Sequence, residues 1–522
     1  MAKSYKDLFQ KYQDSRTLEK ARRYSQWTIP SLMAQVDLDG RSTPLEGDFQ
    51  SDGALLVNGL ASKLTDLLFP TTHPFLRIQM TREDRAVLEE NLGASTTEVE
   101  SYLAELETNA SQRVFLNSSY NQLNLGMKHL IVTGNVAVYR DSALSRTITY
   151  GLERFALKRD GLGFVVDAVI KDHTYFGSLP EDIQAILLDK RPTAGRNMYE
   201  YESALEMYTR VRRERREGGW GYAVTVQIDN IDIPPLDGWY RERTCPWIFP
   251  VMNLVTGENY GRGLVEDHAG SFAKLSEVSF AATLYAIESC KVVNLVGPDS
   301  QNSIEELEVA AHGEYVRATP SSVPAHETGS TQKLSTIYAD LETTFSRLAR
   351  AFMYTGNTRS GERVTAYEIR QQALEVEASQ GGVYSSLSES LQLPLAYLLL
   401  AEIDPEIAYA IAGDDDAPRI NINTGINAIG RATEVQNILR ALVEGQQAVE
   451  LATAADKRID PAKLMDKILA GYSVIKDEIF KTDEQLEAEA QAEQAMAEAQ
   501  SAMQQAEGAA AMLGELDPSL GM

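Results

Sequence analysis

Apolar residues recur at helical spacing in the N-terminal part of the chain. In the first segment four of them fall at i, i+3, i+4 and i+7, which places them on one face of a helix: Tyr5, Leu8, Phe9 and Tyr12. This segment is predicted to stop near Thr28. A leucine at every fourth position from Leu56 to Leu68 predicts a second helix, which Pro70 ends. A third helix is predicted over about 96–116.

From residue 134 the pattern changes to alternating apolar and polar positions, which is typical of half-buried strands. Two β-rich runs flank Asp160-Gly161, so a hairpin is predicted there. Ser178 and Glu181 in SLPEDI have capping-box spacing, which predicts a short helix after them. More strand signal follows in YAVTVQIDNIDI (222–233). The first half of the chain is therefore predicted to form a mixed α/β body.

Two long helices are predicted around a compact insert. Residues 262–289 contain no proline and are rich in Ala and Ser, and residues 291–330 mix β-branched runs with three X-Pro or Gly-Pro breaks. From residue 331 apolar residues return with strong amphipathic spacing, at Leu334, Ile337, Tyr338, Leu341, Phe345, Leu348 and Phe352. The pattern predicts a helical hairpin with a strand-and-loop unit at its tip.

The segment TGNTRSGERVTAYEIR (355–370) follows the second of these helices. Gly356 and Gly361 indicate a non-helical loop, and the Thr365-to-Glu368 spacing predicts that another helix starts there. The loop is thus expected at the end of the hairpin opposite the insert. Between residues 347 and 370 five arginines stand against Glu362 and Glu368, an excess of 5 − 2 = +3: Arg347, Arg350, Arg359, Arg363 and Arg370.

This excess is unusual because the chain has 49 Lys+Arg against 75 Asp+Glu and a net charge of −26. So acidic a surface excludes a protein that grips nucleic acid everywhere, since phosphate neutralisation needs clustered cations. The longest apolar run, 393–401, is far shorter than the ~20 residues of a membrane span, and no secretory signal is visible. Two cysteines, Cys245 and Cys290, fit buried thiols in a reducing cytoplasm.

The search for catalytic chemistry is negative. The chain has no phosphate-binding loop, and its six histidines are scattered without metal-ligand spacing. Asp clusters at 37–39 and 414–416 fit solvated loops better than cation sites. The sequence therefore predicts no catalytic residues, no metal and no cofactor. After Lys481 nine acids and no Lys or Arg follow, which predicts a solvated helix fading into disorder.

Eight ordered blocks of sequence resemble one family, the head-to-tail connector, or portal, proteins of short-tailed autographivirus-type phages. The blocks are QWTIPSL (26–32), NGLASKL with LLFP (58–70), GNVAVY (134–139), FGSLPEDI (176–183), CPW with GENYGRG (245–263), SGERVTAYEIR (360–370), GGVYSSLSESLQLPL (381–395) and TGINAIGR (424–431). Past residue 431 the sequence has no block that is specific to this family.

The resemblance implies a mixed α+β, helix-dominated portal fold with a fixed order of parts. These would be a wing (1–262), a first stem helix (263–290), a β-containing clip (291–330), a second stem helix (331–352), a tunnel loop (353–364), further wing helices (365–424), a helical crown (425–481) and the acidic tail (482–522). Gly356 and Gly361 would be the hinges of the tunnel loop. The five arginines would line the DNA channel, or else pair with acids of a neighbouring subunit.

The same resemblance implies a structural role. The chain would form a homo-oligomeric ring, usually of twelve subunits, at one capsid vertex of the virion after synthesis in the host cytoplasm. Double-stranded DNA would pass through it without sequence specificity during packaging and ejection. Its partners would be terminase, a tail adaptor, major capsid and scaffold proteins, and internal core proteins. It would not interact with a membrane. The alternative is an interaction or scaffolding protein with an acidic helical tail.

Overall fold

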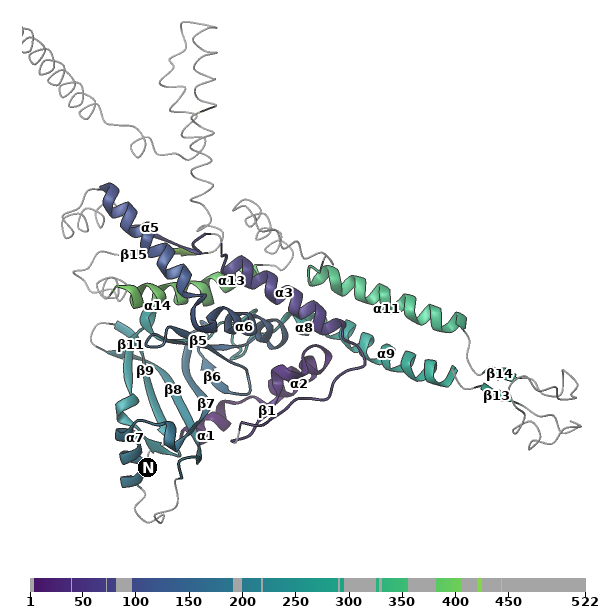
Figure 1. The fold of residues 1–522 in the computed structure, drawn as a ribbon, viewed down its shortest axis with the longest axis horizontal. Coiled ribbons are helices and arrows are strands. Elements are labelled where there is room, and N and C mark those ends of the chain that lie inside the picture. Colours follow the sequence, from purple (N-terminus) through teal and green to yellow (C-terminus); the bar gives the residue numbers. More distant parts are fainter. Residues whose placement is uncertain are drawn as a thin grey trace, which may run out of the picture. The chain divides into compact units, whose positions relative to one another are not determined.

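The computed structural model of the protein describes residues 4–38, 40–71, 73–80, 96–190, 200–216, 219–289, 292–294, 325–327, 331–354, 382–404, 420–424 and 443. The chain divides into two compact units, residues 1–429 and 430–522. All elements described below belong to the first unit, which mixes helices and sheets as predicted (Figure 1).

The N-terminal segment forms two helices, α1 (Tyr5–Tyr12) and α2 (Ser15–Trp27). They are separated because Asp14 caps α2, with its carboxylate accepting hydrogen bonds from the Arg16 backbone N–H at 3.1 Å and the Thr17 hydroxyl at 2.6 Å. The predicted apolar face of α1 packs on the sheet, where Phe9 lies edge-on to Tyr208. A 3₁₀ turn, η1 (Pro30–Met33), and two short strands, β1 (Gln35–Val36) and β2 (Ser42–Thr43), follow.

The largest apolar core lies among helices from distant parts of the sequence. Its members include α3 (Asp52–Leu68), α5 (Thr96–Arg113), α6 (Ser119–Thr133), α13 (Val383–Leu387), η6 (Ser388–Gln392) and α14 (Leu393–Ile403). The four leucines of the α3 pattern are at most 1% exposed, which confirms the predicted helix face. Beside this core β3 (Leu76–Met80) pairs antiparallel with β15 (Ile420–Thr424).

An antiparallel sheet forms the second layer. Its strands are β6 (Phe155–Arg159), β7 (Val165–Tyr175), β8 (Ala204–Arg216), β9 (Gly219–Ile228), β10 (Ile231–Asp232) and β11 (Gly238–Arg241), in the order β10-β9-β8-β7-β6 with β11 also paired to β9. The predicted Asp160-Gly161 turn joins β6 to β7, and the Asp160 carboxylate accepts from the backbone N–H of Leu162 and Phe164. The hairpin is therefore confirmed.

The capping box predicted at Ser178 is wrong, although a helix does follow it. The helix α7 (Glu181–Lys190) begins only after Pro180, and Ser178 closes a 3₁₀ turn, η3 (Phe176–Ser178). The Ser178 hydroxyl donates backwards to the Tyr175 carbonyl at 2.8 Å, so it has no role in capping α7.

A small sheet joins the two layers. Here β4 (Ala137–Asp141) pairs with β5 (Arg146–Tyr150) and with β12 (Trp247–Ile248). The short 3₁₀ turns η2 (Leu116–Ser118), η4 (Pro234–Leu236) and η5 (Glu242–Thr244) complete the body. Next to β12, Cys245 is a buried free thiol as predicted, and burial raises its pKa to about 12. Cys290 lies outside the described residues.

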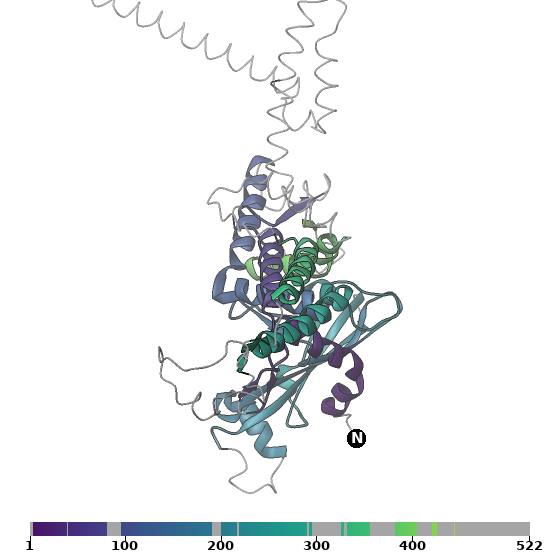
Figure 2. The ribbon, with the colours of Figure 1, turned by 90° about the vertical axis from the view of Figure 1, so that its right-hand side faces the viewer.

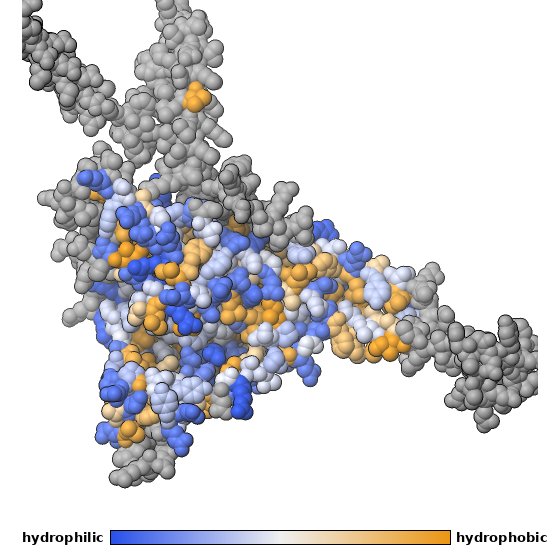
Figure 3. All heavy atoms as spheres, in the orientation of Figure 1, coloured by the Kyte–Doolittle hydropathy of each residue, from blue (hydrophilic) through white to orange (hydrophobic). Residues whose placement is uncertain are grey.

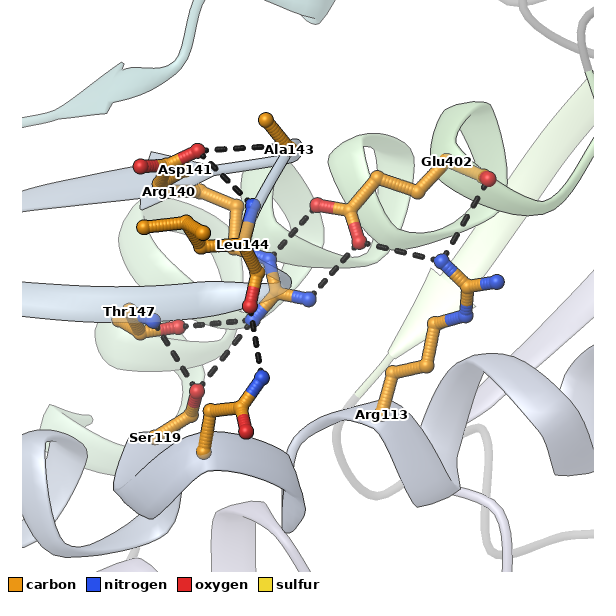
Figure 4. A network of polar contacts seen from close by, with 9 residues as sticks. Arg113, Ser119, Arg140, Asp141, Ala143, Leu144, Thr147 and Glu402 are labelled. Atoms are coloured by element: carbon orange, nitrogen blue, oxygen red, sulfur yellow. Dashed lines mark hydrogen bonds and ion pairs between the residues drawn. The ribbon is translucent and has the colours of Figure 1, made fainter.

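A fully buried ion pair ties α14 to this small sheet. Arg140 on β4 donates from Nε and Nη2 to the two carboxylate oxygens of Glu402 on α14, at 2.7 and 2.8 Å (Figure 4). Its Nη1 donates to the hydroxyls of Ser119 and Thr147. Both side chains are almost inaccessible, with 1% and 4% of their surface exposed. Arg113 on α5 adds a longer contact to Glu402 at 3.4 Å, so three elements converge on one carboxylate.

Because both charges are desolvated, removing one partner leaves the other buried and unpaired. Glu402→Ala is expected to lower the free energy of unfolding by about 3–5 kcal/mol. The double variant Arg140→Met/Glu402→Leu should recover most of this loss, since an apolar pair needs no counter-charge. Thermal and denaturant unfolding curves measure both effects.

The exposed pair Lys274–Asp340, at 2.7 Å, provides the matched control. Asp340→Ala should change stability by less than about 1 kcal/mol, because solvent screens this pair. Equal losses for Asp340→Ala and Glu402→Ala would contradict the assigned importance of the buried pair.

A second buried polar group, His129 on α6, has no counter-charge. Its Nδ1 has no hydrogen-bond partner, and the ring packs so closely on Gly151 that a Cβ there would lie 2.5 Å from Cε1. Burial lowers the pKa of His129 to about 4, since the imidazolium would be desolvated. The folded protein therefore holds this ring neutral.

The unfolded chain protonates the same histidine near its ordinary pKa of about 6.5, so it binds the proton first as pH falls. His129 should thus reduce stability progressively from pH ~6.5 down to ~4, by up to about 3 kcal/mol. His129→Gln should flatten the pH dependence of the melting temperature between pH 6.5 and 5, where most carboxylates stay ionised. Superimposable curves for the two proteins would show that His129 contributes nothing.

Candidate functional site

Two long helices extend side by side away from the body (Figure 1). They are α9 (Ala269–Ser289), which follows the short helix α8 (Leu264–Asp267), and α11 (Thr331–Ala351). Between them in sequence, β13 (Val292–Asn294) pairs antiparallel with β14 (Ala325–Glu327). Figure 2 looks at the helix pair from its outer end. The predicted helical hairpin with strands in its insert is thus present in the structure.

The inner half of the hairpin is anchored in the main core. Phe272 of α9 meets Phe352 edge-on, with ring centroids 5.6 Å apart, and both are buried. Leu275 and Leu348 are each 1% exposed in the same cluster. This burial is what the amphipathic spacing of α11 predicts, and it fixes the direction in which the pair leaves the body.

The outer half of α9 exposes apolar side chains. Phe280, Leu284 and Ile287 are 43%, 51% and 58% exposed, and their i, i+4, i+7 spacing places them on one face. We call these three residues the α9 stripe. No charged residue occurs from 278 to 287, and Figure 3 shows hydrophobic surface gathered over this end of the helix.

One further ring borders the α9 stripe, and another is exposed on α11. Phe49, which precedes α3, contacts Phe280 with ring centroids 4.6 Å apart and is itself 59% exposed. Tyr338 of α11 is 53% exposed. A helix that is apolar all round is normally buried, and contiguous apolar surface of this kind indicates a protein–protein contact. The candidate functional site is therefore a contact surface.

Two of the five predicted channel arginines belong to the described residues. Arg347 and Arg350 lie on the exposed face of α11, and the Arg350 Nε donates to the Ser346 carbonyl at 3.3 Å. Neither makes an ion pair with another residue in the described part of the chain. Arg359, Arg363 and Arg370, and the hinge glycines Gly356 and Gly361, lie outside the described residues.

The described residues hold no group of three or more His, Cys, Asp or Glu side chains arranged to bind a metal ion. Of the helices that the structure describes, none combines the length and the apolar character needed to cross a membrane.

Comparison with known proteins decides the family. A family model described as "Bacteriophage head to tail connecting protein" matches residues 2–479. The chain belongs to this phage head-to-tail connector family.

The sequence of this connector aligns with those of its relatives along nearly their whole length. The chain is 37% identical over 489 residues to the portal protein of Pseudomonas phage phiKMV, covering 93% of both chains. It is 29% identical to the portal protein of Escherichia phage T7, covering 91% of this chain and 87% of that one. The resemblance read from the eight sequence blocks, and the function of a phage portal protein, are confirmed. The family is structural.

A solved chain entitled "Neck of empty GTA particle computed with C6 symmetry" aligns with a TM-score of 0.37 and 10% identity over 82% of this connector and 90% of that chain. This likeness is too weak to support an argument.

Sequence reasoning missed three features. The α9 stripe lies in a segment that the sequence predicted only as a long helix rich in Ala and Ser. Arg140 and Glu402 are 262 positions apart, and neither has a local signal. The arginine-rich segment 210–216 is conspicuous in the sequence, but only the structure shows which of its charges are neutralised.

Proposed function

We propose that this connector assembles into a ring, expected to contain twelve copies, at one capsid vertex, and that genomic DNA is packaged and later ejected through it. The alignment with the phiKMV portal protein over 93% of both chains is the observation that carries the proposal. Terminase, a tail adaptor, capsid and scaffold proteins and internal core proteins are its proposed partners. Synthesis in the host cytoplasm belongs to the same proposal.

The proposed parts of the ring subunit follow the order of the elements. Residues 263–290 and 331–352 are the stem, 291–330 the clip and 353–364 the tunnel loop, with the wing before and after them and the crown beyond residue 424. The α9–α11 pair supports the stem, because it leaves the body as two packed helices. The β13–β14 pair supports a strand-containing clip.

The α9 stripe is proposed to contact a second copy of the chain in the ring. Each copy carries a net charge of −26, so contact through charged surfaces would bring like charges together. An uncharged, apolar stripe avoids this repulsion and gains free energy from the water it releases. Phe49 supplies aromatic area at its border, and aromatic side chains are enriched in such interfaces.

Leu284→Glu/Ile287→Glu should therefore block ring assembly without unfolding the subunit, because both side chains are already exposed in the single chain. Light scattering with negative-stain imaging should find the unmodified protein as a closed ring near 12 × 57.7 = 692 kDa and the variant at low mass. Leu144→Glu/Leu188→Glu, at leucines 63% and 55% exposed elsewhere, is the matched control and should leave the ring intact.

Intact rings from the stripe variant would exclude the α9 stripe as the interface. A stable species of 57.7 kDa from the unmodified protein, even with scaffold and capsid proteins present, would instead favour the scaffolding alternative.

The loop arginines are proposed to steady DNA inside an acidic wall. Duplex DNA carries one charge per roughly 1.7 Å of its axis, so a uniformly basic channel would retain it. A net negative wall with a few guanidinium contacts permits passage, because phosphate contacts position the duplex without reading its sequence. Arg359 and Arg363 are the residues proposed to make these contacts, with Arg347, Arg350 and Arg370 next to them in sequence.

Arg359→Ala/Arg363→Ala should leave assembly intact and change DNA retention in packaging assays, because two phosphate contacts per subunit are removed. The mass of the ring and the amount of DNA that stays packaged after terminase is removed are the two measurements. Loss of the ring itself would assign both arginines to contacts between subunits.

A further inference from the structure

The strongest local positive charge among the described residues lies on β8, far in sequence from the proposed tunnel loop. Five of the seven residues from 210 to 216 are arginine and one is glutamate. Arg241 and Arg243 stand on the neighbouring β11 and η5. Counting these seven arginines against Asp167, Glu214, Glu217 and Glu242 gives 7 − 4 = +3, in a chain whose total is −26.

The arginine-rich end of β8 extends beyond the adjacent strand on one side. The last pair of β7 with β8 is Asp167 with Arg212, whereas β8 continues to pair with β9 up to Arg216 and Gly219. On the other side β11 reaches only to Gly221, which pairs with Arg241. The outermost pairs, from Arg215 to Gly219, therefore form a two-stranded ribbon.

Three of the β8 arginines are held by neighbouring side chains. Arg210 donates to both carboxylate oxygens of Asp167, at 3.0 and 2.6 Å, and Arg216 pairs with Glu214 at 2.6 Å. Arg213 pairs with Glu242 at 3.0 Å. Its guanidinium also lies between the rings of Phe164 and Trp220, 4.2 and 4.8 Å from their centroids.

The remaining two, Arg212 and Arg215, are exposed and make no ion pair with any described residue. Successive side chains of a strand point to opposite faces, so these two lie on opposite faces of β8. Arg215 is in the two-stranded end, and Arg212 is at its base, where β8 still pairs with β7. The three held arginines are neutralised by their acids and fix the position of this end of β8. The free pair is thus available for an external anion on either face.

We propose that the arginine-rich end of β8, residues 210–216 with Trp220 of β9 (the β8 ribbon), binds the phosphate backbone of duplex DNA on the outside of the body, separately from the channel. Guanidinium matches phosphate in bidentate geometry. Its two-stranded tip can enter the major groove of B-DNA, roughly 12 Å wide, so Arg215 at the tip and Arg212 on the opposite face at the base can reach phosphates on both sides. A carboxylate patch on another protein would be met by one face only.

The choice of DNA among polyanions rests on the proposed function, which places packaged DNA inside the capsid that the ring joins. Binding through phosphates predicts no sequence preference and a strong dependence on salt.

Covalently closed circular duplex DNA is the probe, because it cannot thread a channel. The assembled full-length protein is titrated with it at several salt concentrations. Arg212→Ala/Arg215→Ala should weaken binding at least tenfold at low salt and reduce the salt slope by about 2, since each phosphate contact contributes about 0.9. Arg16→Ala/Arg146→Ala removes two exposed arginines from α2 and β5, and should leave binding unchanged.

Unchanged binding of closed circles by the Arg212/Arg215 variant would overturn the proposal, as would an equal loss in the Arg16/Arg146 control. Loss of ring assembly in the Arg212/Arg215 variant would also overturn it, because the ribbon would then contact a neighbouring copy. Arg359→Ala/Arg363→Ala should still bind closed circles. This comparison distinguishes loss of DNA binding at residues 210–216 from loss of DNA binding in the channel.

Discussion

The buried pair between Arg140 and Glu402 is the interaction on which the arrangement of the body depends. Neither charge has access to water, so β4 and α14 must meet in one register, with Ser119 and Thr147 satisfying the guanidinium. The consequence reaches the proposed channel. Phe352 and Tyr384, on either side of residues 355–381, are buried in the same core as α14.

Apolar side chains have two different environments in this connector. Those of the main core are buried, as in the leucines of α3 and the T-shaped contact of Phe272 with Phe352. In the outer half of α9 the same kind of residue stays exposed. A single chain gains nothing from that exposure, so the α9 stripe is understood best as surface that a second copy covers. Assembly would then be driven mainly by release of water from apolar side chains, with charge limiting which surfaces can approach.

The role of each arginine in this acidic chain depends on where it lies in the structure. Arg140 is buried and structural, and Arg210 and Arg213 fix strands and rings around them. Arg212, Arg215, Arg347 and Arg350 are exposed without ion pairs to described residues. DNA is proposed to contact the tunnel loop and the β8 ribbon. Each place offers a few guanidinium groups in a protein whose net charge is negative. Such a surface holds DNA weakly, which suits a structure that the genome must pass.

The sequence by itself determined the family, the α3 and α11 helices, the β6–β7 hairpin and the hairpin of long helices, because each leaves a local period or an ordered block of residues. It failed at Ser178, where a 3₁₀ turn and Pro180 displaced the expected cap. Only the tertiary structure decided that Arg140 meets Glu402 and that three β8 arginines are neutralised. It also decided that two β8 arginines have no ion pair within the described part of the chain, and that no described residue buries the α9 stripe. These facts depend on contacts between residues distant in the chain, and local spacing carries no information about which distant side chain will supply or withhold a partner.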